Sequence, residues 1–251
     1  MTAKLLILGG TTEAAALARA VRETGMQAVI SLAGRVKTPA PQALPHRIGG
    51  FGGIRGLVTY LRENGITHLI DATHPFAAQM SAHAVAASRE AGVKLIALAR
   101  PPWRAEAGDE WIRVRDVAGA VAALSQPRRR VLLAIGRQHL GPFAAQPQHH
   151  YVLRLVDRPE IPPPLPDHHV IVDRGPFSEA GDLALMREHG IELVVSKNSG
   201  GTGAYAKIAA ARRLGLPVLM IERPCLPARR EVFSVAEVME WLAHESADLG
   251  V

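Results

Sequence analysis

Short apolar runs alternate with longer amphipathic stretches along most of the chain. Such runs are typical of buried strands, and apolar residues at helical spacing are typical of helices. The pattern predicts strands at 5–8, 27–32, 46–48, 67–71, 93–98, 131–135, 151–156, 168–172, 192–195 and 217–221, with a short strand at Trp111. It predicts helices at 14–24, 54–64, 75–91, 114–124, 179–189 and 235–245, and one that ends at 214. This alternation indicates an α/β fold with parallel sheets.

The two halves of the chain carry the same landmarks at a nearly constant offset. The offsets are 127, 125 and 123 residues for the pairs Gly9/Gly136, Gly65/Gly190 and Arg100/Arg223. A constant offset indicates duplicated units, although a common supersecondary pattern would look the same. We expect two domains, 1–103 and 104–251, with a cleft between the carboxyl ends of their strands. The sequence does not indicate on which of the two domains the final helix, 235–245, packs.

The first strand runs directly into a turn, Gly9-Gly10-Thr11-Thr12, and then into a helix. Such a turn directs helix N–H groups and their partial positive charge at the space above the strand, where phosphate is the usual ligand. The glycines allow close backbone approach, and either threonine could cap the helix or offer a hydroxyl. The dinucleotide fingerprint has a third glycine that is absent here, so an ordinary strand–helix turn is an equal alternative.

The end of the second predicted strand lacks the acidic residue that holds a ribose 2′-hydroxyl in NAD-binding folds. No Asp or Glu occurs between Glu23 and Glu63, and Arg35 and Lys37 stand in that region instead. An arginine there accommodates a 2′-phosphate. If a dinucleotide binds, we therefore expect NADP(H), with Arg35 on its 2′-phosphate. The alternative is that Arg35 is an ordinary surface residue.

Two further polar loops follow strands at positions where ligands of α/β sheets bind. Asp71, Thr73 and His74 end the fourth strand, although a single histidine is often structural. The loop 196–207 combines hydroxyl and amide side chains, three glycines and Lys197 at a strand end, which suits a phosphate or carboxylate. The loop lacks the spacing of a P-loop, and a solvated surface position for Lys197 is the alternative.

Composition narrows the class of protein further. The 251 residues are 48% hydrophobic and 21% charged, which is typical of a globular protein. The net charge of +6 suits an anionic ligand, whereas scattered basic residues and 4% aromatic content argue against nucleic acid. The single cysteine, Cys225, allows no intrachain disulfide and no cysteine-based metal cluster, and no apolar run suits a signal peptide or a membrane span. We expect a cytoplasmic protein without a metal site or a membrane partner.

Together the motifs resemble the precorrin-6A reductase family of the cobalamin (vitamin B12) pathway over nearly the whole chain. The resemblance rests on Leu-Gly-Gly-Thr-Thr-Glu (8–13), Gly34-Arg35, Asp-Ala-Thr-His-Pro-Phe-Ala (71–77), Arg-Pro-Pro-Trp (100–103), Ile-Gly-Arg (135–137) and Ser-Lys-Asn-Ser-Gly-Gly-Thr-Gly-Ala-Tyr-Ala-Lys (196–207). The motifs at 71–77 and 196–207 are the specific ones. The resemblance implies two Rossmann-like parallel-sheet domains with helices on both faces, and NADPH-dependent reduction of precorrin-6A to precorrin-6B.

This resemblance also implies a set of site residues. The expected cofactor contacts are Gly9, Gly10, Thr11, Thr12, Arg35, Thr73, Ser196 and Asn198. The expected contacts of the anionic tetrapyrrole are Arg137, Lys197, Gly200 and Gly201. Because hydride transfer to a conjugated ring system also needs a proton, His74, Lys197 and Tyr205 are candidate proton donors. We expect a monomer. Whether the substrate is metal-free or contains cobalt is not decided by the sequence.

Two other classes of protein fit the same pattern. A transferase of a tetrapyrrole pathway could use an anionic nucleotide-like donor in the cleft, although Arg35 in place of an acid argues against recognition of an adenosine ribose there. A non-catalytic protein could close two domains on an anionic metabolite. Oxidation of NADPH in the presence of substrate separates both classes from a reductase.

Overall fold

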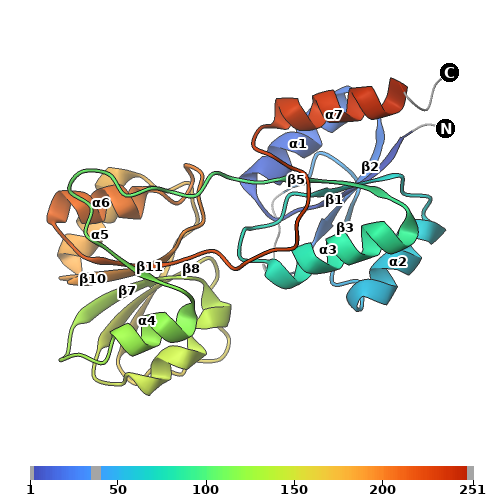
Figure 1. The fold of residues 1–251 in the computed structure, drawn as a ribbon. Helices are drawn as coiled ribbons and strands as arrows, with labels where there is room; N and C mark the ends of the chain where they lie inside the picture. Colours follow the sequence, from blue (N-terminus) through green and yellow to red (C-terminus); the bar gives the residue numbers. More distant parts are fainter. Residues whose placement is uncertain (1–2, 35–40, 248–251) are drawn as a thin grey trace. The chain divides into compact units, whose positions relative to one another are not determined.

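The computed structural model describes residues 3–34 and 41–247 of the chain. The chain forms two compact units (Figure 1). Unit 1 combines Met1–Arg100 with Cys225–Val251, and unit 2 is Pro101–Pro224. Each unit is built around one parallel six-stranded sheet, which confirms the α/β class that the strand–helix alternation predicts.

The sheet of unit 1 has the strand order β12-β5-β4-β1-β2-β3. Its strands are β1 (Lys4–Leu8), β2 (Gln27–Leu32), β3 (His46–Ile48), β4 (His68–Asp71), β5 (Lys94–Leu98) and β12 (Glu231–Val232). Its helices are α1 (Thr12–Glu23), α2 (Gly53–Glu63), α3 (Ala78–Ala91) and α7 (Val235–Ala247). Successive β1 side chains point to opposite faces. Leu5 and Ile7 therefore join the core on the α1 and α7 side, and Leu6 and Leu8 join the core on the α2 and α3 side (Figure 1).

The sheet of unit 2 has the strand order β6-β11-β10-β7-β8-β9. Its strands are β6 (Trp111–Val114), β7 (Arg130–Ala134), β8 (His150–Leu155), β9 (His168–Val172), β10 (Leu193–Lys197) and β11 (Val218–Ile221). Its helices are α4 (Val117–Ala123), α5 (Glu179–Glu188) and α6 (Ala206–Leu214), with two 3-10 helices, η1 (Arg137–His139) and η2 (Gly141–Ala145). Leu132, Val194 and Met220 from the sheet pack against Met186 of α5 and Ile208 of α6.

The two sheets repeat one topology, and this supports the duplication that the constant offsets indicate. Strands β1 to β5 occupy the same positions in unit 1 that β7 to β11 occupy in unit 2. The sixth strands are exchanged, because β6 follows β5 in the chain but pairs with β11, and β12 follows β11 but pairs with β5. The helices that follow them are exchanged in the same way, since α4 packs on β11 and α7 packs on β5.

The exchanged segments also begin their helices alike. The side chain of Asp116 caps α4 by accepting the N–H of Gly119 at 2.9 Å. The hydroxyl of Ser234 precedes α7 and accepts the N–H of Glu237 at 3.2 Å. A side-chain acceptor three residues before the bonded N–H is the usual helix N-cap. The exchanged strand, cap and helix are therefore one repeated segment that occurs twice in the chain.

This exchange explains a difference from the expected domain boundary. The sequence pattern places 104–251 in one domain, but the structure returns residues 225–251 to unit 1. Val232, Val238, Trp241 and Leu242 are buried there in the core on the α1 side. The final helix, which the sequence left unassigned, packs on unit 1 for this reason.

Three local features differ from the sequence pattern or were not part of it. The helix expected from Pro75 begins only at Ala78, because Ala77 N–H bonds back to His74 O at 2.7 Å and closes a turn first. The connection from β7 to β8 consists of 3-10 helices, and the two-residue strand β12 was not predicted. Over residues 3–34 and 41–247, no helix has the length and apolar character that a membrane span requires.

Candidate functional site

The glycine turn after β1 lies at the carboxyl edge of the unit 1 sheet, where α1 begins. Gly9 is packed so closely that an added Cβ would lie 2.8 Å from Ile30 Cδ1. Gly10 has a φ of 108°, which favours glycine, and an added Cβ there would meet nothing within 4 Å. Gly9 therefore makes room for the Ile30 side chain of the neighbouring strand, whereas Gly10 leaves open space above the turn.

The two threonines of this turn differ in their hydrogen bonds. Thr11 caps α1 by accepting a first-turn N–H at 3.0 Å, and its hydroxyl donates to Ala72 O at 2.9 Å. Thr12 is exposed and donates to Glu13 at 3.0 Å. Arg100 pairs with Glu13, so its guanidinium stands beside the helix N-terminus. The turn thus offers an anion the first helix N–H groups, while the Thr11 hydroxyl is already engaged and the Arg100 charge is paired with Glu13.

Asp71 ends β4, directly beside the glycine turn, and only 2% of its surface is exposed. Its Oδ1 accepts the backbone N–H and the hydroxyl of Thr73, at 3.1 and 2.7 Å. Its Oδ2 pairs with the Arg229 guanidinium. Sequence reasoning missed Arg229 because 158 residues separate it from Asp71. In this arrangement Asp71 fixes the position of Thr73, the expected cofactor contact.

His74 lies half-buried in the turn before α3. Its Nδ1 accepts the N–H of Phe76 at 3.2 Å, and the two rings lie 5.9 Å apart. Because Nδ1 acts as an acceptor, the neutral ring carries its proton on Nε2. To act as a proton donor the ring must first be protonated, and Nδ1 then carries hydrogen and no longer accepts from Phe76.

The end of β2 was expected to hold the 2′-phosphate through Arg35. Arg35 lies outside the described residues, so that contact stays a prediction. A different arginine, Arg47 of β3, donates from Nη1 to Ser31 Oγ at the end of β2, at 2.7 Å. Sequence reasoning passed over Arg47, although it stands just before the glycine-rich stretch 49–53.

In unit 2, the loop expected to bind ligands follows β10 at the carboxyl edge of the sheet. Its first residues, Ser196, Lys197 and Asn198, are buried, with 0%, 9% and 2% of their surface exposed. The Asn198 amide accepts the N–H of Trp103 at 2.8 Å and donates to its carbonyl at 3.1 Å. Asn198 therefore anchors this loop to the segment that enters unit 2.

The same tryptophan supports the glycines of the loop. Trp103 Nε1 donates to Gly201 O at 2.7 Å. Lys207 Nζ donates to Ala204 O at 2.6 Å and lies 5.0 Å from the centre of the Trp103 ring. Gly200 and Gly201 have φ values of 66° and 70°, so the loop conformation itself favours glycine at these two positions.

Two other expected site residues lie nearer the surface of unit 2. The Tyr205 hydroxyl donates to Glu106 at 2.9 Å and accepts from Arg212. Burial raises the pKa of Tyr205, and the hydrogen bond from Arg212 acts in the opposite direction. Arg137 is exposed at the start of η1, directly after Gly136, which lies two residues beyond the end of β7. The Tyr205 proton is therefore held in a network of charged groups, whereas Arg137 is accessible to an anionic ligand.

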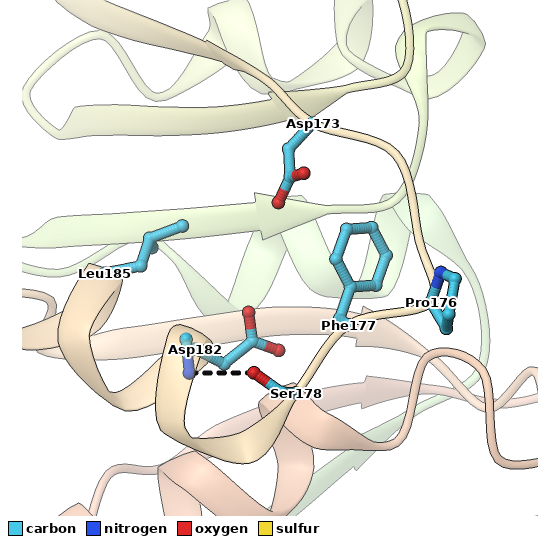
Figure 2. A pocket seen from close by; sticks show the side chains of 7 residues that line it. Asp173, Pro176, Phe177, Ser178, Asp182 and Leu185 are labelled. Carbon is cyan, nitrogen blue, oxygen red and sulfur yellow. Dashed lines mark hydrogen bonds between the residues drawn. The ribbon is translucent and has the colours of Figure 1, made fainter.

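A pocket of about 250 Å³ opens at the carboxyl end of β9, beside the first turn of α5 (Figure 2). It is lined by Asp173, Pro176, Phe177, Ser178, Gly181, Asp182 and Leu185. Figure 2 shows the Asp173 and Asp182 carboxylates on either side of the space, with the Phe177 ring at its end. Two carboxylates make this pocket unsuitable for an anion, so we do not include it in the candidate site.

A buried charge cluster adjoins this pocket. Asp182 pairs with Arg154, both are less than one-tenth exposed, and Arg154 Cζ lies 3.7 Å from the centre of the Phe177 ring. Burial lowers the pKa of Lys207 to about 7; the Arg154 charge also lowers it, and the Asp182 charge raises it. Sequence reasoning did not single out this cluster, because its members come from three separate elements, β8, α5 and α6.

The expected residues therefore form one set in each unit. Unit 1 holds Gly9, Gly10, Thr11, Thr12, Thr73 and His74, and unit 2 holds Arg137, Ser196, Lys197, Asn198, Gly200, Gly201 and Tyr205. In the part of the chain that the structure describes, no group of three or more His, Cys, Asp or Glu side chains is arranged to hold a metal ion.

The fold and the turn define the class of protein. A parallel sheet with β1 at its centre and a glycine turn leading into α1 is the arrangement of Rossmann-like dinucleotide-binding domains. A family model described as "Precorrin-6x reductase CbiJ/CobK" matches residues 4–243. The chain belongs to this family of cobalamin biosynthesis, which confirms the resemblance and makes the protein an oxidoreductase. A reductase of this kind implies a nicotinamide cofactor.

Individual relatives agree with the family. A precorrin-6A reductase of Rhodobacter capsulatus is 58% identical over 244 residues, or 97% of each chain. One of Sinorhizobium sp is 50% identical and covers 96% of this chain and 93% of its own. A cobalt-precorrin-6A reductase of Priestia megaterium is 26% identical over 96% and 99% of the two chains. A solved structure titled "CobK precorrin-6A reductase", 58% identical over 97% of each chain, matches with a TM-score of 0.94 and confirms the two-domain α/β fold.

Proposed function

We propose that this protein reduces precorrin-6A to precorrin-6B with NADPH as the hydride donor. The family match over residues 4–243 is the observation that carries the proposal. The relatives at 58% and 50% identity are named for precorrin-6A, and the relative at 26% is named for the cobalt form, so we assign the metal-free substrate. A monomer in the cytoplasm belongs to the same proposal.

The cofactor is assigned to unit 1. Gly10 leaves the space that a pyrophosphate needs, and the α1 N-terminus supplies the matching partial positive charge, beside the Arg100–Glu13 ion pair. Asp71 holds Thr73 in a fixed position, and Thr73 is the residue we expect beside the nicotinamide. When bound, NADPH supplies a hydride to a double bond of the macrocycle.

The tetrapyrrole is assigned to unit 2. Its carboxylate side chains need cations, and the carboxyl edge of this sheet carries Arg137 and Lys197. Gly200 is buried and Gly201 is half-buried, so Gly201 is the glycine whose bare backbone we assign to close contact with a flat ring. Trp103 and Asn198 hold that loop in place, so we give Asn198 a positioning role in addition to its expected place near the cofactor.

Reduction of one double bond adds a hydride and a proton, so a donor for the proton is needed. Among the three candidates, the Tyr205 hydroxyl already donates to Glu106. A protonated histidine is a stronger acid than a phenol, and Lys197 ends β10, at the ligand edge of the sheet. We therefore favour His74 and Lys197 over Tyr205 as the donor.

The test is an assay with purified protein, enzymatically prepared precorrin-6A, and either NADPH or NADH. We expect NADPH oxidation that depends on the tetrapyrrole, and a product heavier by two hydrogens. A product whose mass has increased by that of a transferred group, instead of two hydrogens, would indicate a transferase. NADPH oxidation that is absent despite tetrapyrrole binding would indicate a non-catalytic binder. The cobalt-containing substrate in a parallel assay tests the metal-free assignment.

Variants of the donor candidates refine this assay. If His74 is the donor, His74→Gln lowers kcat and leaves the dissociation constant of NADPH unchanged. His83→Gln, on helix α3, is the matched control and should leave both quantities unchanged. Full kcat in His74→Gln together with a loss in Lys197→Met would move the role to Lys197.

A further inference from the structure

Arg47 lies in the same row of the sheet as the end of β1. Leu8, Ser31 and Arg47 are register partners across β1, β2 and β3. The backbone carbonyl of Ser31 accepts the N–H of Gly9 at 2.9 Å, and its hydroxyl accepts from Arg47. Two strand spacings place the Arg47 backbone about 10 Å from the glycine turn. Ser31 therefore links the expected pyrophosphate site to the Arg47 side chain.

The Arg47 guanidinium is held in place by neutral groups. Nη1 donates to Ser31 Oγ at 2.7 Å and to Gly49 O at 2.9 Å, and Nη2 donates to Gly50 O at 2.9 Å. The Phe51 ring lies against one face of the guanidinium, with Cζ 3.9 Å from the ring centre. These bonds use three of the five N–H groups. Among the residues that the structure describes, Nε–H and one hydrogen of Nη2 have no acceptor.

The charge of Arg47 also distinguishes it from four of the other arginines described above. These four pair with carboxylates: Arg100, Arg154, Arg212 and Arg229. Within the described ranges, 3–34 and 41–247, Arg47 has no carboxylate partner. A fixed guanidinium with two N–H groups left over and no counter-charge is well suited to a phosphate monoester, which it binds through paired hydrogen bonds.

We propose that Arg47 binds the 2′-phosphate of the dinucleotide and sets the preference for NADPH over NADH. This inference rests on the proposed function, which assigns the cofactor to unit 1. The acidic residue of NAD-binding folds stands near the end of β2, and Ser31 there leaves the Arg47 charge unneutralised. An added Cβ at Gly49 or Gly50 would meet nothing within 4 Å, so the backbone beside Arg47 leaves room for a ligand.

The experiment measures dissociation constants of the full-length protein for NADPH, NADH and adenosine 2′,5′-bisphosphate. Arg47→Met should weaken NADPH and the bisphosphate by about ten- to a hundredfold, the range for charge-assisted hydrogen bonds, and leave NADH unchanged. Arg47→Lys keeps the charge but loses the paired donors, so its dissociation constant for NADPH should lie between those of wild type and Arg47→Met. Arg55→Met removes an exposed arginine of α2 and is the matched control for charge alone.

A second variant covers the case in which Arg47→Met disturbs its own loop. Ser31→Asp places a carboxylate beside the guanidinium, where it should neutralise Arg47, repel a 2′-phosphate and favour NADH. An equal loss of NADPH and NADH binding in Arg47→Met, with the NADPH preference kept in Ser31→Asp, would assign Arg47 a structural role only.

The outcomes separate this inference from the proposed function. Wild-type protein that prefers NADPH, with the preference kept in Arg47→Met and lost in Arg35→Ala, would overturn the assignment to Arg47 and leave the reductase proposal standing. Wild-type protein that binds neither dinucleotide nor the bisphosphate, with or without tetrapyrrole, would overturn both.

Discussion

Lys207 provides a direct test of the buried charge cluster in unit 2. Its ammonium group is enclosed by the Trp103 ring and Ala204 O, and the charged groups that act on it are Arg154 and Asp182. Burial lowers its pKa to about 7 from 10.5, because the interior disfavours the charged form. Folding therefore removes a proton from this lysine at any pH between those two values.

The sign of the effect on stability follows from proton counting. Between pH 7 and pH 10.5 the unfolded chain keeps the Lys207 proton and the folded chain does not, so the free energy of unfolding rises with pH. The full slope is about 1.4 kcal/mol per pH unit. Near pH 7 the folded lysine is half protonated, so the gain between pH 7 and pH 9 is about 2 kcal/mol.

The assay is urea unfolding of wild type and Lys207→Met at pH 7, 8 and 9, followed by tryptophan fluorescence. Trp103 lies against Lys207 and reports on unit 2. The difference in stability between the two proteins should change by about 2 kcal/mol over this range, in favour of wild type at higher pH. Lys94→Met, at an exposed lysine, is the control and should show no such change. A constant difference between wild type and Lys207→Met would refute the reasoning, since it would mean that Lys207 stays charged when folded.

Three further substitutions test packing around the two sites. Gly9→Ala should cost about 1–3 kcal/mol of stability, because its Cβ would lie 2.8 Å from Ile30 Cδ1; a thermal unfolding temperature equal to wild type would show that the turn relaxes freely. Trp103→Phe removes an indole donor worth about 1 kcal/mol and should raise KM for the tetrapyrrole by loosening the loop it supports; an unchanged KM would argue against that support. Arg229→Met leaves Asp71 buried without a counter-charge and should cost about 3–5 kcal/mol in urea unfolding. Adding Asp71→Asn should recover part of this loss, and no recovery would contradict the pairing.

The local part of the fold could be predicted from the sequence. Most of the strands are short apolar runs that end in glycine or polar residues, and this local pattern is enough to predict them. They are β1, β2, β4, β5, β7, β10 and β11. The strand β12 was missed because it has only two residues and no pattern of its own. Its pairing with β5 depends on tertiary packing of the helix that follows it.

The candidate site shows the same division between local and long-range information. The glycine turn and the Asp71 loop could be predicted because each is continuous in the sequence. The hydrogen-bond and ion-pair partners of these loop residues could not be predicted. Thr11 donates to Ala72, and Asp71 pairs with Arg229, far along the chain. Such partners depend on which strands become neighbours, and a single sequence carries little direct information about that.

The exchange of the sixth strands gives these long-range contacts a common origin. Arg229 lies just before β12, so the segment that completes the sheet of unit 1 also brings the counter-charge of Asp71. Asp71 in turn fixes Thr73, beside the expected nicotinamide position. The expected cofactor site of unit 1 therefore depends on residues that follow the whole of unit 2 in the sequence. In a chain with this topology, the two repeats are completed by each other, and neither site is encoded by one half of the sequence alone.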